Sequence, residues 1–390
     1  MNKNKKIIYP LTASSWNDKE ITALHRLIDG SNFSMGLNVK KFEKNFAKFH
    51  KVKYSVMVNS GSSANLLMVA SLFYQKTKHK IKKGDEVIVP AVGWSTSYNP
   101  LHQLGLKIKF VDIDIETLNF DLEKLKKSIS NKTKIIFAIN LLGNCNNFSV
   151  IKKLIGQKKI LIIEDNCESL GAKFKKKYSG TFGIMSSTSF FYSHHMSTIE
   201  GGAILTNNNE LYKILKILRA HGWVRDILDK KKLNFNNKFR FVLPGYNLRP
   251  TEINGVLGNI QLKKLTKFIK VRRSNAKYFI SKFKKLNNII IQKEIGDSSW
   301  FGFSIILRKN AKIQRKKIIE IFEKNGIETR PIVSGNFSKQ EVCKFYDLSK
   351  NLSLTNSEIV DKNGFFIGNH HFDMRNKINY VFNLLRRYIN

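Results

Sequence analysis

The chain has 390 residues, more than one simple core holds, and the length suits two packed domains. Hydrophobic residues make up 42% and aromatic residues 11%, which excludes wholesale disorder and allows a sizeable buried core. The formal charge of +39 at pH 7 comes from basic residues spread along the whole chain, so we interpret it as solvated surface and not as a nucleic-acid-binding stripe.

The sequence also lacks several other signals. No stretch approaches the roughly 20 apolar residues of a membrane span, and the basic start is not followed by a signal-peptide core, so we expect a cytoplasmic protein without a membrane partner. The three cysteines are scattered, which predicts no disulfide framework, no metal site and no iron–sulfur cluster held by four thiolates.

Predicted strands and helices alternate through the first two thirds of the chain. The helical segments include residues 63–73 and 122–130. Strands without strict alternation of apolar and polar residues are typical of a sheet covered on both faces. The pattern therefore predicts an α/β protein with a mostly parallel sheet. The expected strands are residues 54–58, 86–90, 109–113, 134–139, 160–164, 189–192 and 202–206.

The pattern changes after about residue 261. A long basic helix is predicted over residues 252–285, followed by strands at 289–292 and 302–307 and a helix at 314–325. We therefore expect a large α/β domain at residues 1–255 and a small C-terminal α+β domain at residues 256–390.

A glycine and serines stand between the first predicted strand and the following helix. Gly61 permits a tight turn, and the amides and hydroxyls of Ser62 and Ser63 would face an anion at the helix N-terminus. An ordinary serine-capped helix start explains the same residues equally well.

An acidic cluster follows the strand predicted at residues 160–164. Asp165 and Glu168 fall at the carboxyl end of this strand, the edge where open α/β sheets bind ligands. A carboxylate buried there needs a cationic partner, and a pyridinium nitrogen would supply one. A solvated loop is the alternative.

Two adjacent histidines, His194 and His195, lie between hydroxyl-rich and glycine-rich flanks. A histidine near its ordinary pKa suits general acid–base chemistry. A metal pair is the alternative, although neighbouring side chains rarely face the same way and the sequence shows no third ligand. For His195 we expect a structural role.

The order and spacing of these segments resemble the DegT/DnrJ/EryC1/StrS family of sugar aminotransferases, which have the type I fold of enzymes that use pyridoxal 5′-phosphate (PLP). The resemblance extends from residue 10 to the Arg330–Pro331 pair and includes a Gly-Tyr-Asn-x-Arg element at residues 245–249. It implies a seven-stranded, mostly parallel sheet and a homodimer with shared active sites. The implied cofactor-binding residues are Gly61, Ser62, Ser63, Trp94, Asp165, Glu168, Ser189 and, across the dimer, Asn247; His221 and Arg249 are candidate substrate contacts.

The chain departs from the family at one position. Family aminotransferases carry a lysine five residues after the serine that corresponds to Ser189, and here that position is His194, with no lysine before Lys213. Imidazole has no primary amine and cannot form a Schiff base with PLP. This exchange marks the 3-dehydratase subgroup, in which the cofactor is held without a covalent bond.

The resemblance implies that His194 is the catalytic residue and that PLP and its amino form, PMP, serve with L-glutamate as amino donor. The implied reaction removes the C3 hydroxyl of a nucleotide-linked 4-keto-6-deoxy sugar, most closely GDP-4-keto-6-deoxy-D-mannose, for lipopolysaccharide O-antigen synthesis. Two alternatives stay open: a 4-aminotransferase that uses another lysine, and a non-catalytic PLP-binding relative.

Overall fold

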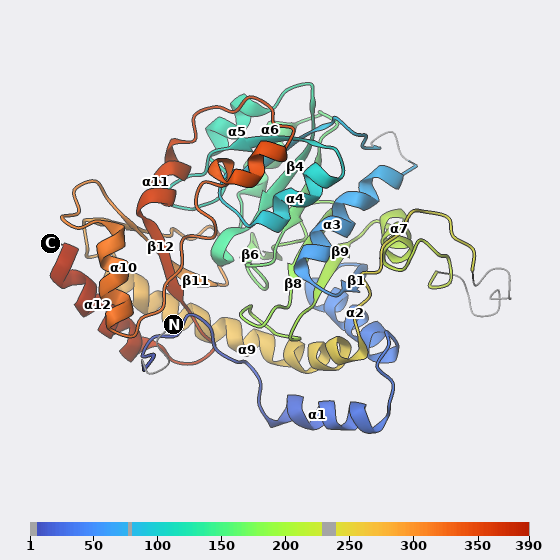
Figure 1. The fold of residues 1–390 in the computed structure, drawn as a ribbon, viewed down its shortest axis with the longest axis horizontal. Helices are drawn as coiled ribbons and strands as arrows, with labels where there is room; N and C mark the ends of the chain where they lie inside the picture. Colours follow the sequence, from blue (N-terminus) through green and yellow to red (C-terminus); the bar gives the residue numbers. More distant parts are fainter. Residues whose placement is uncertain (1–5, 77–79, 228–238, 390) are drawn as a thin grey trace.

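The computed structural model of the protein covers residues 6–76, 80–227 and 239–389. A central sheet is covered by helices on both faces, the long helix α9 (Glu252–Phe283) runs beneath it, and a smaller sheet lies beside the C-terminal helices (Figure 1). The sheet edge where its parallel strands end carries the candidate site described below.

The central sheet has seven strands in the order β1-β9-β8-β5-β4-β2-β3. Only β9 runs against the others, since it pairs antiparallel with β1 and β8 while the remaining neighbours pair parallel. The strands are β1 (Tyr54–Val58), β2 (Glu86–Pro90), β3 (Lys107–Val111), β4 (Thr133–Ile139), β5 (Leu161–Asp165), β8 (Met185–Ser189) and β9 (Gly202–Thr206). The predicted mostly parallel seven-stranded sheet is confirmed.

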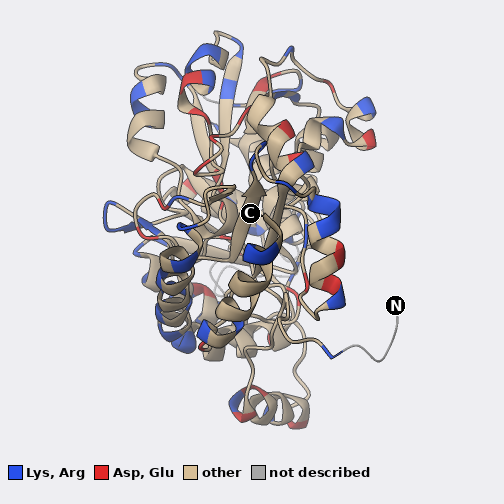
Figure 2. Ribbon diagram, turned by 90° about the vertical axis from the view of Figure 1, so that its left-hand side faces the viewer, with Lys and Arg blue, Asp and Glu red and all other residues tan. Residues whose placement is uncertain are grey.

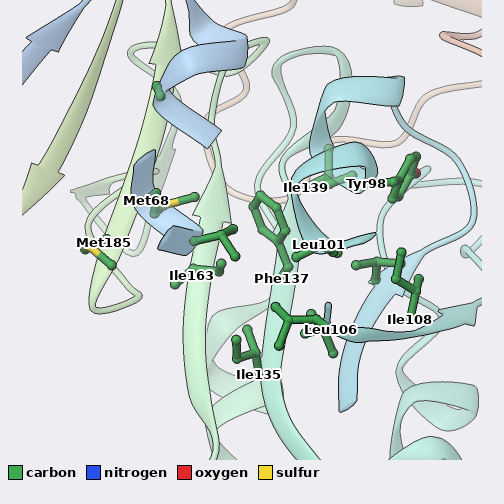
Figure 3. Close-up of a cluster of buried hydrophobic side chains, with 14 of the residues drawn as sticks. Met68, Tyr98, Leu101, Leu106, Ile108, Ile135, Phe137, Ile139, Ile163 and Met185 are labelled. Atoms are coloured by element: carbon green, nitrogen blue, oxygen red, sulfur yellow. The ribbon is translucent and has the colours of Figure 1, made fainter. Parts of the chain in front are cut away.

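The core explains why these strands lack alternation. Every residue of β2, β8 and β9 is buried, because helices cover both faces of the sheet. Phe137 of β4 lies in the middle of one apolar cluster, between Ile163 of β5 and Leu101 of α4 (Ser95–Gln103) (Figure 3). This cluster fixes the strands that carry the site.

The large layer consists of the central sheet and the helices that pack on the sheet or, as α1 (Asp18–Asp29) does, on α9 (Figure 1). Helix α3 (Gly61–Ser71) lies over β8 and β9 and packs against α4. The others are α1 (Asp18–Asp29), α2 (Leu37–His50), α5 (Leu122–Ser128), α6 (Phe148–Ile155) and α7 (Asn209–Arg219), with 3-10 turns η1 (Leu72–Tyr74) and η2 (Leu141–Gly143) and a hairpin of β6 (Lys173–Phe174) and β7 (Lys177–Tyr178).

Helix α9 joins the two layers of the molecule. Its first residue, Glu252, accepts hydrogen bonds from the backbone amides of Gly36, Asn38 and Val39 at 2.8–3.0 Å, so a buried carboxylate stabilises the N-terminus of α2. Its last turns pack Phe279 and Phe283 into a second apolar core with the small sheet. The predicted domain boundary at residues 255/256 falls inside this helix, and the division into domains stays a prediction.

The C-terminal part of the chain forms a second layer, which we call the small layer. It is a three-stranded antiparallel sheet, β10-β11-β12, packed on helices. Its elements are β10 (Ile289–Ile291), β11 (Gly302–Leu307), α10 (Arg315–Lys324), η4 (Phe337–Lys339), η5 (Glu341–Phe345), α11 (Thr355–Asn363), β12 (Gly364–Gly368) and α12 (Arg375–Ile389). This is the small α+β layer that the sequence predicted.

The strand predicted at residues 189–192 is wrong. Strand β8 instead spans Met185–Ser189, where it pairs with β5 and β9, and the chain leaves the sheet at Phe190. Phe190 packs edge-on against Phe42 and Phe46 of α2. Its apolar side chain therefore reflects this packing and not a place in a strand. The turn that carries the two histidines therefore begins earlier than the apolar pattern indicated.

Basic side chains are spread over many elements, with acidic ones between them (Figure 2). No helix in the described part of the chain has the length and apolar character needed to cross a membrane. Within the same residues, no group of three or more histidine, cysteine, aspartate or glutamate side chains could hold a metal ion.

Replacing His50 with phenylalanine should make the protein less sensitive to acid. His50 is buried among Phe46, Phe49 and Tyr178, and its Nδ1 donates to the carbonyl oxygen of Phe46 at 3.0 Å. Burial lowers the pKa of His50 to about 4. Because the unfolded chain takes up the proton near pH 6.5 and the folded chain only near 4, stability is lost as the pH falls through this window, by roughly 2 kcal/mol at about pH 5 for this one residue.

The measurement is the free energy of unfolding in urea at about pH 8 and pH 5 for the parent and His50→Phe proteins. The decrease in the free energy of unfolding between about pH 8 and pH 5 should be smaller in the variant by roughly 2 kcal/mol. An equal loss in both proteins would show that His50 is not a source of the acid sensitivity.

Candidate active site

A cavity of about 340 Å³ opens where β5 and β8 end. We call it the active-site cavity. Its walls come from the turn before α3, the loop after β2, the ends of β5 and β8, and the small layer. The residues that line it include Gly61, Ser62, Asn65, Trp94, Ser97, Asp165, Glu168, Ser189, Ser193, His194, Phe301, Arg330 and Phe366.

Asp165 is the last residue of β5 and lies buried at the base of the cavity. Its Oδ2 accepts from Nδ2 of Asn65 at 2.8 Å and from Oγ of Ser97 at 2.7 Å, and its Oδ1 accepts from the amide of Cys167 at 3.0 Å. Among the described residues, no cation pairs with this carboxylate. Neutral donors thus orient it while its charge stays available to a cationic ligand.

The first turn of α3 approaches the end of β8 very closely. A Cβ added to Gly61 would lie 2.5 Å from Cβ of Ser189, so only glycine fits there. The hydroxyl of Ser60 accepts from the amide of Ser63 at 3.0 Å and caps the helix. A helix N-terminus of this kind, with the exposed hydroxyl group of Ser62 beside it, suits an anionic ligand.

His194 stands in the turn after β8, on the cavity wall. Its ring meets Phe301 edge-on with the centroids 5.2 Å apart, and its amide donates to the carbonyl oxygen of Phe191 at 2.9 Å. Its Nδ1 is buried and has no hydrogen-bond partner among the described residues. Burial lowers the pKa of His194 to about 4, while Asp165 raises it and Arg272 lowers it further. The imidazole is therefore neutral at neutral pH.

His195 faces the interior instead of the cavity. It is buried, and its Nε2 lies 3.1 Å from the carbonyl oxygen of Ser299, to which it donates. Burial is the main cause that lowers the pKa of His195 well below its ordinary value. This contact ties the histidine turn to the segment that carries Phe301, which is a structural role.

Two glutamates near Asp165 differ in their environments. Glu164 is buried and accepts four hydrogen bonds, from the amides of Gly180, Phe182 and Gly183 and from a side-chain amide, and it holds the turn before β8. Glu168 lines the cavity and accepts from the amide of Leu142 at 2.9 Å.

Burial, with Asp165 nearby, raises the pKa of Glu168 to about 7. Its carboxyl group is therefore divided between the neutral and the ionised form at neutral pH. It can donate or accept a hydrogen bond toward a ligand.

These residues fit the PLP that the family resemblance implies. Asp165 presents a negative charge without a cationic partner, which suits a pyridinium nitrogen. The start of α3 at Gly61 and the exposed Ser62 line the same cavity, and a helix N-terminus suits a phosphate. Trp94, with 55% of its surface exposed, lines the same cavity.

Most of the predicted site residues meet in this cavity: Gly61, Ser62, Trp94, Asp165, Glu168, Ser189 and His194 all line it. Ser63 takes part in the helix cap instead. His221, Asn247 and Arg249 lie outside the lining, in a separate segment where Nε of Arg249 donates to Oδ1 of Asn247 at 3.0 Å. Their predicted contacts with cofactor and substrate stay predictions.

The sequence alone did not reveal several cavity residues. Asn65 and Ser97 bind Asp165, Phe301 packs on His194, and Arg330 reaches in from the small layer. Helical spacing places Asn65 one turn after Gly61, which is the one local signal that could have indicated it.

The fold and this cavity define the class of protein. The chain belongs to the DegT/DnrJ/EryC1/StrS aminotransferase family, whose model matches residues 15–386. Within the family it is similar to a protein of Escherichia coli O55:H7 (strain CB9615 / EPEC) named GDP-4-keto-6-deoxy-D-mannose 3-dehydratase. The two are 51% identical over 388 residues, which cover 97% of this chain and 100% of the relative. The resemblance predicted from the motifs is confirmed.

Two solved structures extend the comparison. The E. coli GDP-4-keto-6-deoxy-D-mannose-3-dehydratase with bound hydrated PLP matches with a TM-score of 0.96 and 50% identity, over 98% of this chain and 100% of that one. A GDP-4-keto-6-deoxymannose-3-dehydratase with a trapped PLP–glutamate geminal diamine matches with a TM-score of 0.95 and 50% identity, over 97% and 100%. The expected PLP-dependent aminotransferase fold is confirmed.

Proposed function

We propose that this chain is a GDP-4-keto-6-deoxy-D-mannose 3-dehydratase that depends on PLP and L-glutamate. It removes the C3 hydroxyl group and yields the 4-keto-3,6-dideoxy sugar. One observation carries the proposal: His194 lines the cavity at the position of the family lysine, and among the described lining residues there is no lysine. The names and bound ligands of the similar proteins support the same assignment.

The chain's own residues would hold the cofactor without a covalent bond. Asp165 would keep the pyridine nitrogen protonated, and the turn at Gly61, Ser62 and Ser189 would bind the phosphate. Trp94, which lines the same cavity, would contact the ring. When bound, the cofactor supplies an amino group taken from L-glutamate and an electron sink for loss of the hydroxyl group.

His194 moves the protons. A neutral imidazole accepts a proton at its unprotonated ring nitrogen, and the pKa of about 4 keeps that nitrogen free at neutral pH. The protonated ring then donates to the departing C3 hydroxyl group. A lysine at this position would compete for the cofactor and return the amino group to the sugar, whereas histidine keeps the acid–base role alone.

We also propose a homodimer with shared active sites. Phe241 and Val242 are 58% and 41% exposed in the segment that carries Asn247 and Arg249. An apolar segment of this kind suits burial against a second copy. In the dimer, Asn247 would reach the phosphate, and His221 and Arg249 the substrate, of the other copy. We place the enzyme in the cytoplasm, in O-antigen sugar synthesis.

The test is the mass of the product. The purified protein is incubated with PLP, L-glutamate and GDP-4-keto-6-deoxy-D-mannose, and the sugar nucleotide is measured by mass spectrometry. We expect a net loss of one oxygen atom, with release of ammonia and 2-oxoglutarate. An amine in place of the ketone would refute the dehydratase in favour of transamination.

A further inference from the structure

Arg272 lies in the middle of α9 with only 4% of its surface exposed, and no carboxylate among the described residues pairs with it. A buried guanidinium group normally has such a partner, because burial of an unpaired charge is costly. Within the same residues its Nε also has no hydrogen-bond partner. Burial lowers the pKa of Arg272 to about 10, which leaves the group charged at neutral pH. Helix α9 therefore brings an uncompensated positive charge into the interior.

The guanidinium group of Arg272 binds two backbone oxygens of the small layer. Its Nη1 donates to the carbonyl oxygen of Phe301 at 3.2 Å and to that of Asn369. In return, Nδ2 of Asn369 donates to the carbonyl oxygens of Arg272 at 3.1 Å and Trp300 at 2.9 Å. Trp300 has a φ of +49°, a left-handed backbone that large side chains rarely adopt, so its segment needs such contacts to keep its shape.

Phe301 connects this buried cation with the histidine turn. Its carbonyl oxygen accepts from Arg272, while its ring lies 5.2 Å from the ring of His194 and 5.7 Å from that of His195. His195 adds a second connection, since its Nε2 donates to the carbonyl oxygen of Ser299 at 3.1 Å. A change at Arg272 therefore reaches the imidazole of His194 through one intervening residue.

The charges around His194 have both signs and come from different elements. Burial is the main cause that lowers the pKa of His194 to about 4, Asp165 at the end of β5 raises it, and Arg272 on α9 lowers it. Asp165 favours the protonated imidazole, and Arg272 opposes it. The neighbour in the same turn is His195, and the other ionisable groups that line the active-site cavity are Cys167, Glu168, Glu200 and Arg330.

We propose that Arg272 is a positioning residue for the proton transfer, which fixes His194 through Phe301 and repels a proton from its imidazole. This inference rests on the proposed function of His194. That residue accepts one proton and passes it to the departing C3 hydroxyl group, which leaves as water. A nearby positive charge favours the neutral ring before this step and makes the protonated ring a stronger acid during it. Arg272 is outside the cavity lining, so it acts through His194 and not on a ligand.

The first measurement is the protonation of His194 itself, which needs no substrate. Protein with added PLP is labelled with ¹³C at the histidine Cε1 carbons and titrated by NMR from about pH 8 to about pH 5. The His194 signal is the one absent from His194→Asn. In the parent it should stay at its neutral position. In Arg272→Gln it should move toward the protonated position at a pH higher by roughly one unit, because Asp165 is then unopposed. Arg272→Lys, which keeps the charge, should resemble the parent.

The second measurement is the pH dependence of kcat for sugar dehydration. Its acid limb should move to higher pH in Arg272→Gln in parallel with the NMR signal, and the midpoint does not depend on how much of a variant is folded. Arg273→Gln is the matched control. Arg273 is the next residue of α9 and also donates to backbone oxygens, those of Ser298 and Asp297 at 2.9 Å, but not to that of Phe301. It should leave signal and acid limb unchanged.

The outcomes separate a role of the charge from a role in the fold. Should Arg272→Gln not fold, Arg272→Met removes the charge without burying a new polar group and repeats the test. An unchanged His194 titration in the neutral variants would show that Arg272 only supports the fold, and an equal shift in Arg272→Lys would show that the charge is not the cause; either result overturns the inference. Failure of the parent to convert the sugar nucleotide would instead refute the proposed function, while the titration still decides whether Arg272 acts on His194.

Discussion

Replacing His194 with asparagine should lower the rate of sugar dehydration by at least about 10³-fold while PLP still binds. Asparagine is smaller than histidine but keeps polar atoms against Phe301, and it cannot accept and return a proton. The residues proposed to hold the cofactor lie elsewhere, at the base of the cavity and at the start of α3. Removal of the proton carrier therefore separates binding from chemistry.

Dehydration is measured by product mass, and PLP binding by the absorbance of the cofactor. His25→Asn is the matched control, since His25 is exposed on α1 and should leave both unchanged. Turnover of the His194→Asn protein within about tenfold of the parent rate would rule out His194 as the acid–base residue.

Replacing Asp165 with asparagine should have an effect of similar size on both halves of the reaction. The substitution keeps the shape of the side chain but removes the charge that stabilises a pyridinium nitrogen. It also sets a new amide group against the donors Asn65 and Ser97, which lie 2.8 and 2.7 Å from Oδ2. We expect about 10³-fold slower conversion of glutamate, slower dehydration and weaker cofactor binding.

The matched control is Glu164→Gln, a substitution of the preceding residue. Glu164 is buried and points to the turn at residues 180–183 and not into the cavity, so its loss should lower stability by roughly 1–3 kcal/mol with a much smaller effect on rate. Single-turnover kinetics and urea unfolding of both variants separate the two effects. Equal rate losses in the two proteins would argue that Asp165 acts only through the fold.

The local sequence predicted the parts of the site that depend on short-range geometry. Gly61 follows a buried strand and opens a helix, and Asp165 ends another strand; both statements require only the order of residues along the chain. The carboxyl ends of parallel strands share one sheet edge, where ligands bind, and the family resemblance implied that these residues bind one cofactor. The structure brings them together with Ser189 and His194 around one cavity.

Other contacts depend on the strand order. Asn65 reaches Asp165 because α3 lies across β8 and β9, a crossing set by the sheet order β1-β9-β8-β5. Arg330 arrives from the small layer through its pairing with Phe366. Helical spacing from Gly61 could have placed Asn65 near the site, but nothing around Asn65 or Arg330 indicates which residue it contacts, because the two members of each contact come from different elements.

The sequence by itself determined the buried strands, the glycine turn and the carboxylate at a strand end, because each is a property of consecutive residues. The replacement of lysine by histidine followed from the resemblance to the family. Only the tertiary structure decided where β8 ends, which nitrogen of His194 is buried without a partner, and that Arg330 is the cation of the cavity. These features arise from packing between elements far apart in the chain, and packing depends on all the surfaces that meet.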